Sequence, residues 1–376
     1  MNFDFSEDLN MLRDEARKFL AERCTTKAVR RILEGDAPYD RELWTQVAQM
    51  GWLGAAVPES YGGAGLGHEG LCVLAEEIGR AIAPIPFASS VYLATEAILA
   101  HGSDAQKRKY LPKLAAGELI GAFAVAEGPD NPRPEAISAR LHGGTLSGSK
   151  WPVADGSVAD LAVIVAKDEA GTPRLAIVEL AGKGVSRETL KTIDPTRDQA
   201  RLDFDGALAE PLGDAGWAAV QALLDRAAVL VAFEQVGGAQ ACLEMATSYA
   251  KDRVAFGRPI GSFQAIKHKL ADVYIATELA RSNAYYGAWA LSTDAPELPL
   301  AAAAARVAAT EAYHLASKEN IQTHGGMGFT WELDCHLFYR RAKMLALALG
   351  SARHWKNRLV DRWDAATPAA DAQPTH

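Results

Sequence analysis

The feature that most restricts the fold of this chain is a hydrophobic periodicity that changes twice. Between about residues 119 and 212 the apolar residues fall in short β-branched or alternating segments: LIGAFAVAE, ADLAVIVAKD, PRLAIVEL and QARLDFDG. Turn sequences such as HGG, DEAGTP and AGKG separate these segments, as expected between strands. The flanking regions have the three- and four-residue spacing of helices. The sequence therefore predicts an α+β fold with a middle β-domain at 119–212, rather than an alternating βαβ array.

Residues 1–118 are predicted to form an N-terminal helical domain. The first helix is expected to begin after Ser6, a favourable N-cap, because the following apolar residues are spaced by three and four positions. Asp40 is expected to cap a second helix that ends at Gly51. YGGAGLG at 61–67 lacks both the glycine spacing and the preceding strand of a phosphate loop, so we interpret it as a connection between helices.

Residues 213–365 are predicted to form a C-terminal bundle of long helices rich in Ala and Leu. One of them, AAAAARVAATEAYHLASKENIQ, is expected to break at Gly325 and Gly326. The remaining segment, 366–376, is small, polar and contains proline, so we expect a disordered tail.

Composition excludes several classes of function. The chain has 376 residues and a net charge of −8, which provides no basic field for nucleic acid or an anionic membrane. No apolar run approaches the roughly 20 residues that span a bilayer, and the N-terminus lacks the features of a signal peptide. The four cysteines and nine histidines show no metal-ligand or disulfide spacing, so we expect no metal. A cytoplasmic protein is the simplest expectation.

Two motifs combine residue types that suit a flat, anionic ligand. In KDRVAFGRPIGSFQAIKHKLAD (251–272), Arg253 offers a guanidinium fork for phosphate, Phe256 an aromatic face, and Gly-Arg-Pro a tight turn. In QTHGGMGF (322–329), Gln322 offers an amide, and the glycines let backbone N–H groups approach an anion. Physical chemistry alone leaves the alternatives open, a polar helix connection and a glycine-rich helix end.

Taken together, these motifs closely resemble those of the acyl-CoA dehydrogenase family. The resemblance rests on PESYGGAGLG, DPTRDQARLDFDG, RVAFGRPIGSFQAIKHKLAD and QTHGGMGFTWELDCHLFYRRAK, which occur in the family's order over roughly residues 5–360. It implies an N-terminal helical domain, a middle β-domain and a C-terminal four-helix bundle. It also implies a dimer of dimers, made of identical chains or of this chain with a second family member.

The family oxidises the Cα–Cβ bond of an acyl-CoA thioester with FAD, and electron-transfer flavoprotein is the partner that the resemblance implies. A carboxylate removes the α-proton while hydride passes to the flavin. FAD spans two subunits, and one subunit reaches into the cofactor held by its neighbour. The residues that resemble this reaching set are Arg253, Phe256, Gln264, Gln322, Gly325 and Gly326.

The positions that resemble the flavin's own pocket depart from the family pattern. Where the family has T-E-P, this chain has Ala126, Glu127 and Gly128, so a flavin-bonding hydroxyl is absent at Ala126 although the glutamate remains; Val125 and Ala126 are the expected cofactor-contact positions. The family's later W-I-T is replaced by Pro-Val-Ala at 152–154, which removes a second hydroxyl. The aromatic cover has either moved to Trp151 or been lost.

The family's catalytic base is a glutamate before Gly-Thr, and this position is Leu349 here. Some members place the base on an earlier helix, one residue before an arginine, which corresponds to Asp225. The alternative for Asp225 is an ordinary carboxylate on a helix surface. Two main hypotheses follow: an active flavoenzyme with Asp225 as base, or the non-catalytic subunit of a heteromeric acyl-CoA dehydrogenase for a bulky acyl group such as a steroid side chain. A homo-oligomer that binds acyl-CoA without oxidising it is a third hypothesis.

Overall fold

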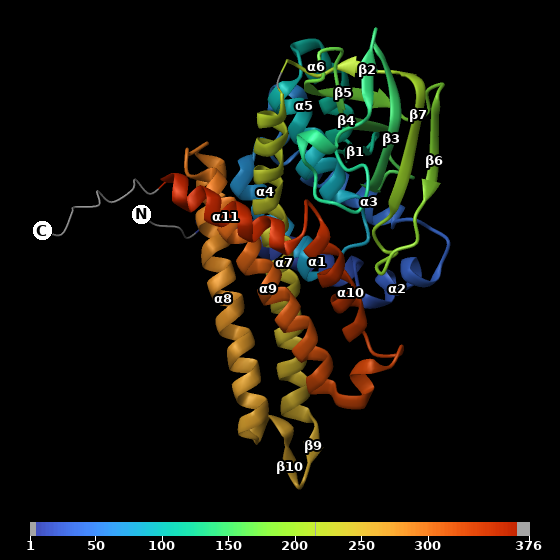
Figure 1. Cartoon of the computed structure of the whole chain (residues 1–376). Coiled ribbons are helices and arrows are strands. Elements are labelled where there is room, and N and C mark those ends of the chain that lie inside the picture. Colours follow the sequence, from blue (N-terminus) through green and yellow to red (C-terminus); the bar gives the residue numbers. More distant parts are fainter. Residues whose placement is uncertain (1–4, 215, 367–376) are drawn as a thin grey trace, which may run out of the picture.

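The computed structural model describes residues 5–214 and 216–366, and Figure 1 shows a sheet at one end of a bundle of long helices. Of the tail predicted to be disordered, only Ala366, the last residue of a helix, is among the described residues.

Helices form the part of the chain that precedes the sheet. They are α1 (Glu7–Arg23), α2 (Thr26–Glu34), α3 (Arg41–Gln49), α4 (Gly67–Arg80), α5 (Glu96–His101) and α6 (Asp104–Ala115), with short helices η1 (Trp52–Gly54), η2 (Glu59–Tyr61) and the π-helix η3 (Ala88–Thr95). Ser6 caps α1, and Asp40 caps α3 by accepting a hydrogen bond from the Leu43 N–H at 3.1 Å. Both caps were predicted. The helix after Asp40 is, however, the third, because α2 was missed.

The middle of the chain forms a mixed sheet. Its strands are β1 (Gly121–Ala124), β2 (Arg140–His142), β3 (Thr145–Ala154), β4 (Leu161–Lys167), β5 (Pro173–Glu179), β6 (Val185–Thr189), β7 (Gln199–Leu208) and β8 (Glu210–Pro211), with η4 (Pro134–Ala136) before β2. The strand order is β6-β7-β3-β2-β4-β5-β8, and β1 pairs with β4 in parallel. The longer neighbours, β3 with β7 and β4 with β5, run antiparallel. The α+β prediction is confirmed.

Long helices return after the sheet. They are α7 (Trp217–Asp252), α8 (Gln264–Ser292), α9 (Leu298–His324), α10 (Cys335–Leu347) and α11 (Ala352–Ala366), with β9 (Val254–Ala255), β10 (Arg258–Pro259), η5 (Ile260–Ser262) and η6 (Gly325–Phe329) between them. The predicted break after α9 is confirmed, since Gly325 has a left-handed φ of 62°.

Two glycines allow α4 to cross α7 at close range. A Cβ atom at Gly79 would lie 1.9 Å from the carbonyl oxygen of Glu234, and one at Gly237 would lie 1.9 Å from that of Glu76. Any larger residue at these positions would force the helices apart. This crossing fixes the N-terminal helices against the bundle.

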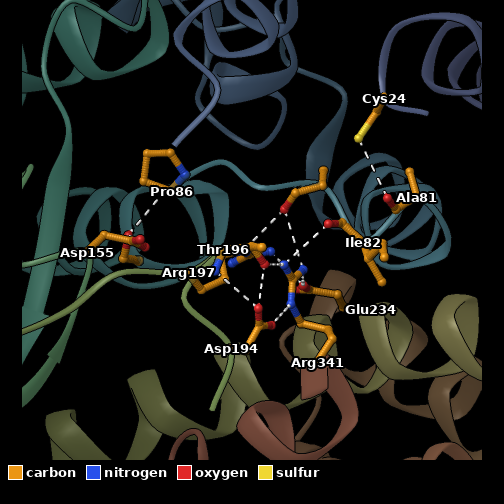
Figure 2. Close-up of polar contacts among 12 residues, drawn as sticks. Cys24, Ala81, Ile82, Pro86, Asp155, Asp194, Thr196, Arg197, Glu234 and Arg341 are labelled. Carbon is orange, nitrogen blue, oxygen red and sulfur yellow. Dashed lines mark hydrogen bonds and ion pairs between the residues drawn. The ribbon is translucent and has the colours of Figure 1, made fainter. Parts of the chain in front are cut away.

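A buried network of ion pairs joins the three parts of the fold (Figure 2). Arg341 of α10 donates from Nε to Asp194 at 2.7 Å and from Nη2 to the carbonyl oxygen of Ile82 at 3.3 Å. Arg197 donates to Glu234 of α7 at 2.6 Å. Because the four ionised side chains are almost fully buried, removing any one would leave an uncompensated charge in the interior.

Two findings concern membranes and metals. Within residues 5–214 and 216–366, no helix combines the length and hydrophobicity needed to cross a membrane. In the same residues, no group of three or more His, Cys, Asp or Glu side chains is arranged to hold a metal ion. The cytoplasmic location stays a prediction.

Candidate functional site

The first predicted cofactor-contact segment is a β-hairpin between α7 and α8. At its turn, Phe256 and Gly257 have φ values of 53° and 79°, the positive values that a two-residue type I′ hairpin requires. The turn is therefore centred on these two residues, whereas the sequence predicted a turn at Gly-Arg-Pro. Phe256 is 96% exposed at the tip, and Arg253 lies exposed at the C-cap of α7.

The second segment lies where α9 ends. Gln322 is exposed on the last turn of α9, and the Gly325 N–H donates to the Gln322 carbonyl oxygen. A Cβ atom at Gly325 or Gly326 would meet nothing within 4 Å, so a ligand could approach this backbone directly. Gln264, on the first turn of α8, is also exposed.

These two segments lie at the same end of the bundle, the end farthest from the sheet in Figure 1. Tyr249, on the last turns of α7, packs its ring against His324 of α9 at a centroid distance of 4.2 Å. Among the described residues, the side chains of Arg253, Gln264 and Gln322 have no hydrogen-bond partner. The fold thus gathers three unpaired donor side chains and an exposed aromatic ring at one end of the bundle.

The other predicted cofactor pocket lies at the end of β1, where the chain continues through Val125 and Ala126. The Trp151 N–H donates to the Ala126 carbonyl oxygen at 3.0 Å, and the Gly128 N–H donates to that of Trp151 at 2.9 Å. The backbone groups that surround the missing hydroxyl are therefore bonded to one another.

The charged residues of this pocket are also paired. Lys150 is fully buried, and its Nζ lies 2.7 Å from Oε1 of Glu127, whose Oε2 accepts from the Ser138 N–H at 2.7 Å. Burial lowers the pKa of Lys150 to about 8, although Glu127 opposes the shift. Burial opposes ionisation of Glu127, but Lys150, Ser138 and the Ala139 N–H outweigh it and lower its pKa.

The residues at the end of β1 do not fit a flavin held by side-chain hydrogen bonds. The side chains of Ala126 and Ala154 have no polar atom, and Glu127 and Lys150 already bond each other. Pro152, in the place of the expected covering ring, is exposed and cannot donate. The free groups at the far end of the bundle fit the pyrophosphate and amide acceptors of FAD much better.

Leu349 lies in the turn between α10 and α11. It packs against the hydrophobic core, and its carbonyl oxygen accepts from the Trp355 indole at 3.1 Å. Two residues after Leu349, Ser351 donates its N–H to Oδ1 of Asn131 at 2.8 Å. The turn is thus fixed to the loop that follows β1, and it carries a leucine at the position where the resemblance predicts a catalytic carboxylate.

Asp225 of α7 is not an exposed surface carboxylate, and that alternative is wrong, since the residue is only 2% exposed. Its Oδ1 accepts from Arg358 at 2.9 Å, and its Oδ2 accepts from Arg362 at 2.6 Å. Burial raises the pKa of the Asp225 carboxyl above its usual value, although both arginines oppose the shift. Both oxygens are occupied, so the structure gives Asp225 the contacts of an anchor for α11.

Arg358 and Arg362 were not identified from the sequence as partners of Asp225, although their spacing on α11 indicates that they face the interior. They share the three- and four-residue spacing of Trp355 and Leu359, the inward-facing apolar residues of α11. Charged residues on the inward stripe of a helix require a buried partner. That requirement could have linked α11 to Asp225.

The fold, two helical regions with a middle sheet between them, is that of a class of flavin-dependent oxidoreductases. Residues 6–118 match the model of the acyl-CoA dehydrogenase N-terminal domain, and residues 214–362 match that of the acyl-CoA dehydrogenase C-terminal domain. The chain belongs to the acyl-CoA dehydrogenase family.

Particular relatives are similar over nearly the whole chain. Acyl-CoA dehydrogenase IpdE2 of Mycobacterium tuberculosis is 36% identical over 94% of this chain and 96% of its own. The solved Tcur3481-Tcur3483 steroid ACAD is 32% identical with a TM-score of 0.87, covering 96% of this chain and 99% of that chain. The ChsE4-ChsE5 complex from Mycobacterium tuberculosis is 28% identical with a TM-score of 0.89, and the match covers 98% of this chain and 100% of that chain.

Proposed function

We propose that this chain is the non-catalytic subunit of a heteromeric acyl-CoA dehydrogenase. Its partner subunit holds most of the FAD and supplies the catalytic base, and electron-transfer flavoprotein accepts the electrons. This chain contributes contacts to the partner's FAD from one surface, namely Arg253, Phe256, Gln264, Gln322, Gly325 and Gly326.

One observation carries the proposal. At the far end of the bundle, side chains that could bind FAD have no hydrogen-bond partner among the described residues, whereas the polar side chains of the pocket after β1 bond each other. The side chains of Arg253 and Gln322 are exposed and unpaired within the described part of the chain. The pocket after β1 has lost two hydroxyls, and its remaining polar groups, Glu127 and Lys150, bond each other. Mutations that accumulate without selection would be expected to remove FAD-binding groups from both ends of the molecule alike.

The choice of a heteromeric complex is supported by similarity. The names of two solved structures, Tcur3481-Tcur3483 and ChsE4-ChsE5, each join two proteins, and one is called a steroid ACAD. A substrate with a bulky acyl group, such as a steroid side chain on coenzyme A, agrees with this similarity. The contacts of Asp225 with α11 argue against the competing hypothesis, a self-sufficient enzyme with Asp225 as base.

The proposal is tested by the flavin content of the purified chain. The chain alone should retain little FAD after extensive dialysis and should not oxidise acyl-CoA thioesters. Isolated through an affinity tag from its native host, it should be accompanied by a second family member in a yellow complex with fewer FAD molecules than chains. A yellow homotetramer with one FAD per chain and acyl-CoA turnover would refute the proposal.

A further inference from the structure

The last turn of α7 contacts each segment that bears the proposed FAD contacts. On the hairpin side, the Arg253 N–H donates to the carbonyl oxygen of Tyr249 at 2.8 Å, which caps the helix. The carbonyl oxygen of Arg253 in turn accepts from the Ile260 N–H at 2.8 Å. The two ends of the hairpin are therefore fixed to this turn by backbone hydrogen bonds.

The start of α8 is fixed to the same turn by close packing. A Cβ atom at Gly261 would lie 2.8 Å from the carbonyl oxygen of Ala250, so only glycine allows η5 to lie this close to α7. The α8 helix begins two residues after η5, with Gln264 on its first turn. The position of Gln264 thus depends on the last turn of α7.

The third segment, η6, contacts this turn through the Tyr249 side chain. The Tyr249 ring packs on the His324 ring with an interplanar angle of 32°, and its hydroxyl lies 4.0 Å from Sδ of Met327. His324 is itself held, because its Nδ1 lies 2.8 Å from the Asn320 carbonyl oxygen and must donate to it. The Sγ atom of Cys335 lies 3.5 Å from the same nitrogen.

We propose that Tyr249 is a positioning residue for FAD binding across the subunit interface. Its backbone holds Arg253, and its ring holds the segment that carries Gln322 and Gly325, so one residue sets the distance between the two groups of contacts. Binding sites lose affinity when their groups are held loosely, even if every group is present. This inference rests on the proposed function of the chain as a contributor to a partner's FAD.

The test compares two substitutions in the complex isolated through a tag on this chain. Tyr249→Phe keeps the ring contact with His324, whereas Tyr249→Leu removes it. After removal of flavin, the affinity for added FAD is measured by fluorescence titration, with thermal unfolding measured in parallel. We expect Tyr249→Leu to weaken FAD binding at least tenfold and Tyr249→Phe to stay within threefold of the wild type. Tyr61→Leu, at a half-buried tyrosine in the N-terminal part of the fold, is the matched control.

The double variant Tyr249→Leu/Gln322→Ala separates the possible outcomes. If the Tyr249 ring acts through the segment that carries Gln322, the double variant should lose less than the product of the two single losses. An unchanged affinity in Arg253→Ala would contradict the proposed function itself. A loss in Arg253→Ala with none in Tyr249→Leu would overturn only the positioning role. If Tyr249→Leu fails to fold, His324→Leu removes the same ring contact from the other side and should give the same loss.

Discussion

Replacing Asp225 with asparagine separates an anchoring role from a catalytic one. The carboxylate accepts three charge-assisted hydrogen bonds, at 2.9, 2.9 and 2.6 Å, from Arg358 and Arg362. Breaking a fully buried ion pair by removing one partner costs about 3–5 kcal/mol. The arginine side chains here are 11% and 18% exposed, so water can solvate them in part. We therefore expect Asp225→Asn to lower the free energy of unfolding by about 2–3 kcal/mol.

The assay is urea unfolding of the full chain, combined with hydrogen exchange of α11. Amide protection should fall mainly in α11, since Asp225 holds that helix through both arginines. A matched variant, Asp225→Leu with Arg358→Met and Arg362→Met, should recover most of the loss, because apolar residues of similar size replace a buried ion pair at little cost. If Asp225→Asn instead leaves stability within 0.5 kcal/mol and reduces acyl-CoA oxidation by the chain alone about 10²-fold or more, the anchoring argument is wrong and Asp225 is the base.

Three further predictions concern packing, protonation and cofactor contact. Gly79→Ala should destabilise the fold by about 2 kcal/mol or more in chemical unfolding, because its Cβ would lie 1.9 Å from the Glu234 carbonyl oxygen. Burial raises the pKa of Asp155 to about 6, so its contribution to stability is present below about pH 4 and is lost as the pH rises through about 6. Asp155→Asn should therefore unfold with less dependence on pH over that range and be more stable than the wild type near neutral pH; an unaltered profile would contradict the shift. Arg253→Ala should weaken FAD retention in the complex by about 1.5–3 kcal/mol, as absorbance after dialysis would measure, whereas Arg108→Ala, at an exposed arginine of α6, should not.

Much of the fold could be predicted because its local signals are strong. Ser6 and Asp40 are good caps, the β-branched runs of β4 and β5 read clearly as strands, and Gly325 marks the end of α9. β3 was not predicted as a strand, because it contains Gly148 and Pro152 and alternates weakly. It is instead stabilised by pairing with β7, which is distant in sequence. Tertiary pairing of this kind leaves little trace in a local window.

The candidate site was predictable in its residue types but not in its contacts. Arg253 and Phe256 were selected for their chemistry, and the structure places them near Gln322 through the packing of Tyr249, which no motif indicated. The partners of Asp225 were also hidden, because Arg358 and Arg362 lie more than 130 residues away. Contacts between distant segments depend on how helices cross, and a single sequence does not specify that crossing.

The length of α7 has a consequence for assembly. Asp225 lies on α7, and Arg253 is the C-cap residue of the same helix, 28 residues further along; because an α-helix rises 1.5 Å per residue, about 42 Å separates them. Because α7 is continuous, rearranging side chains cannot shorten the distance between its two ends. One molecule therefore cannot bring both ends of this helix to the same small ligand. In the proposed assembly, the FAD that Arg253 contacts is held by the partner subunit, and about 42 Å of helix separates this contact from Asp225 within the same chain.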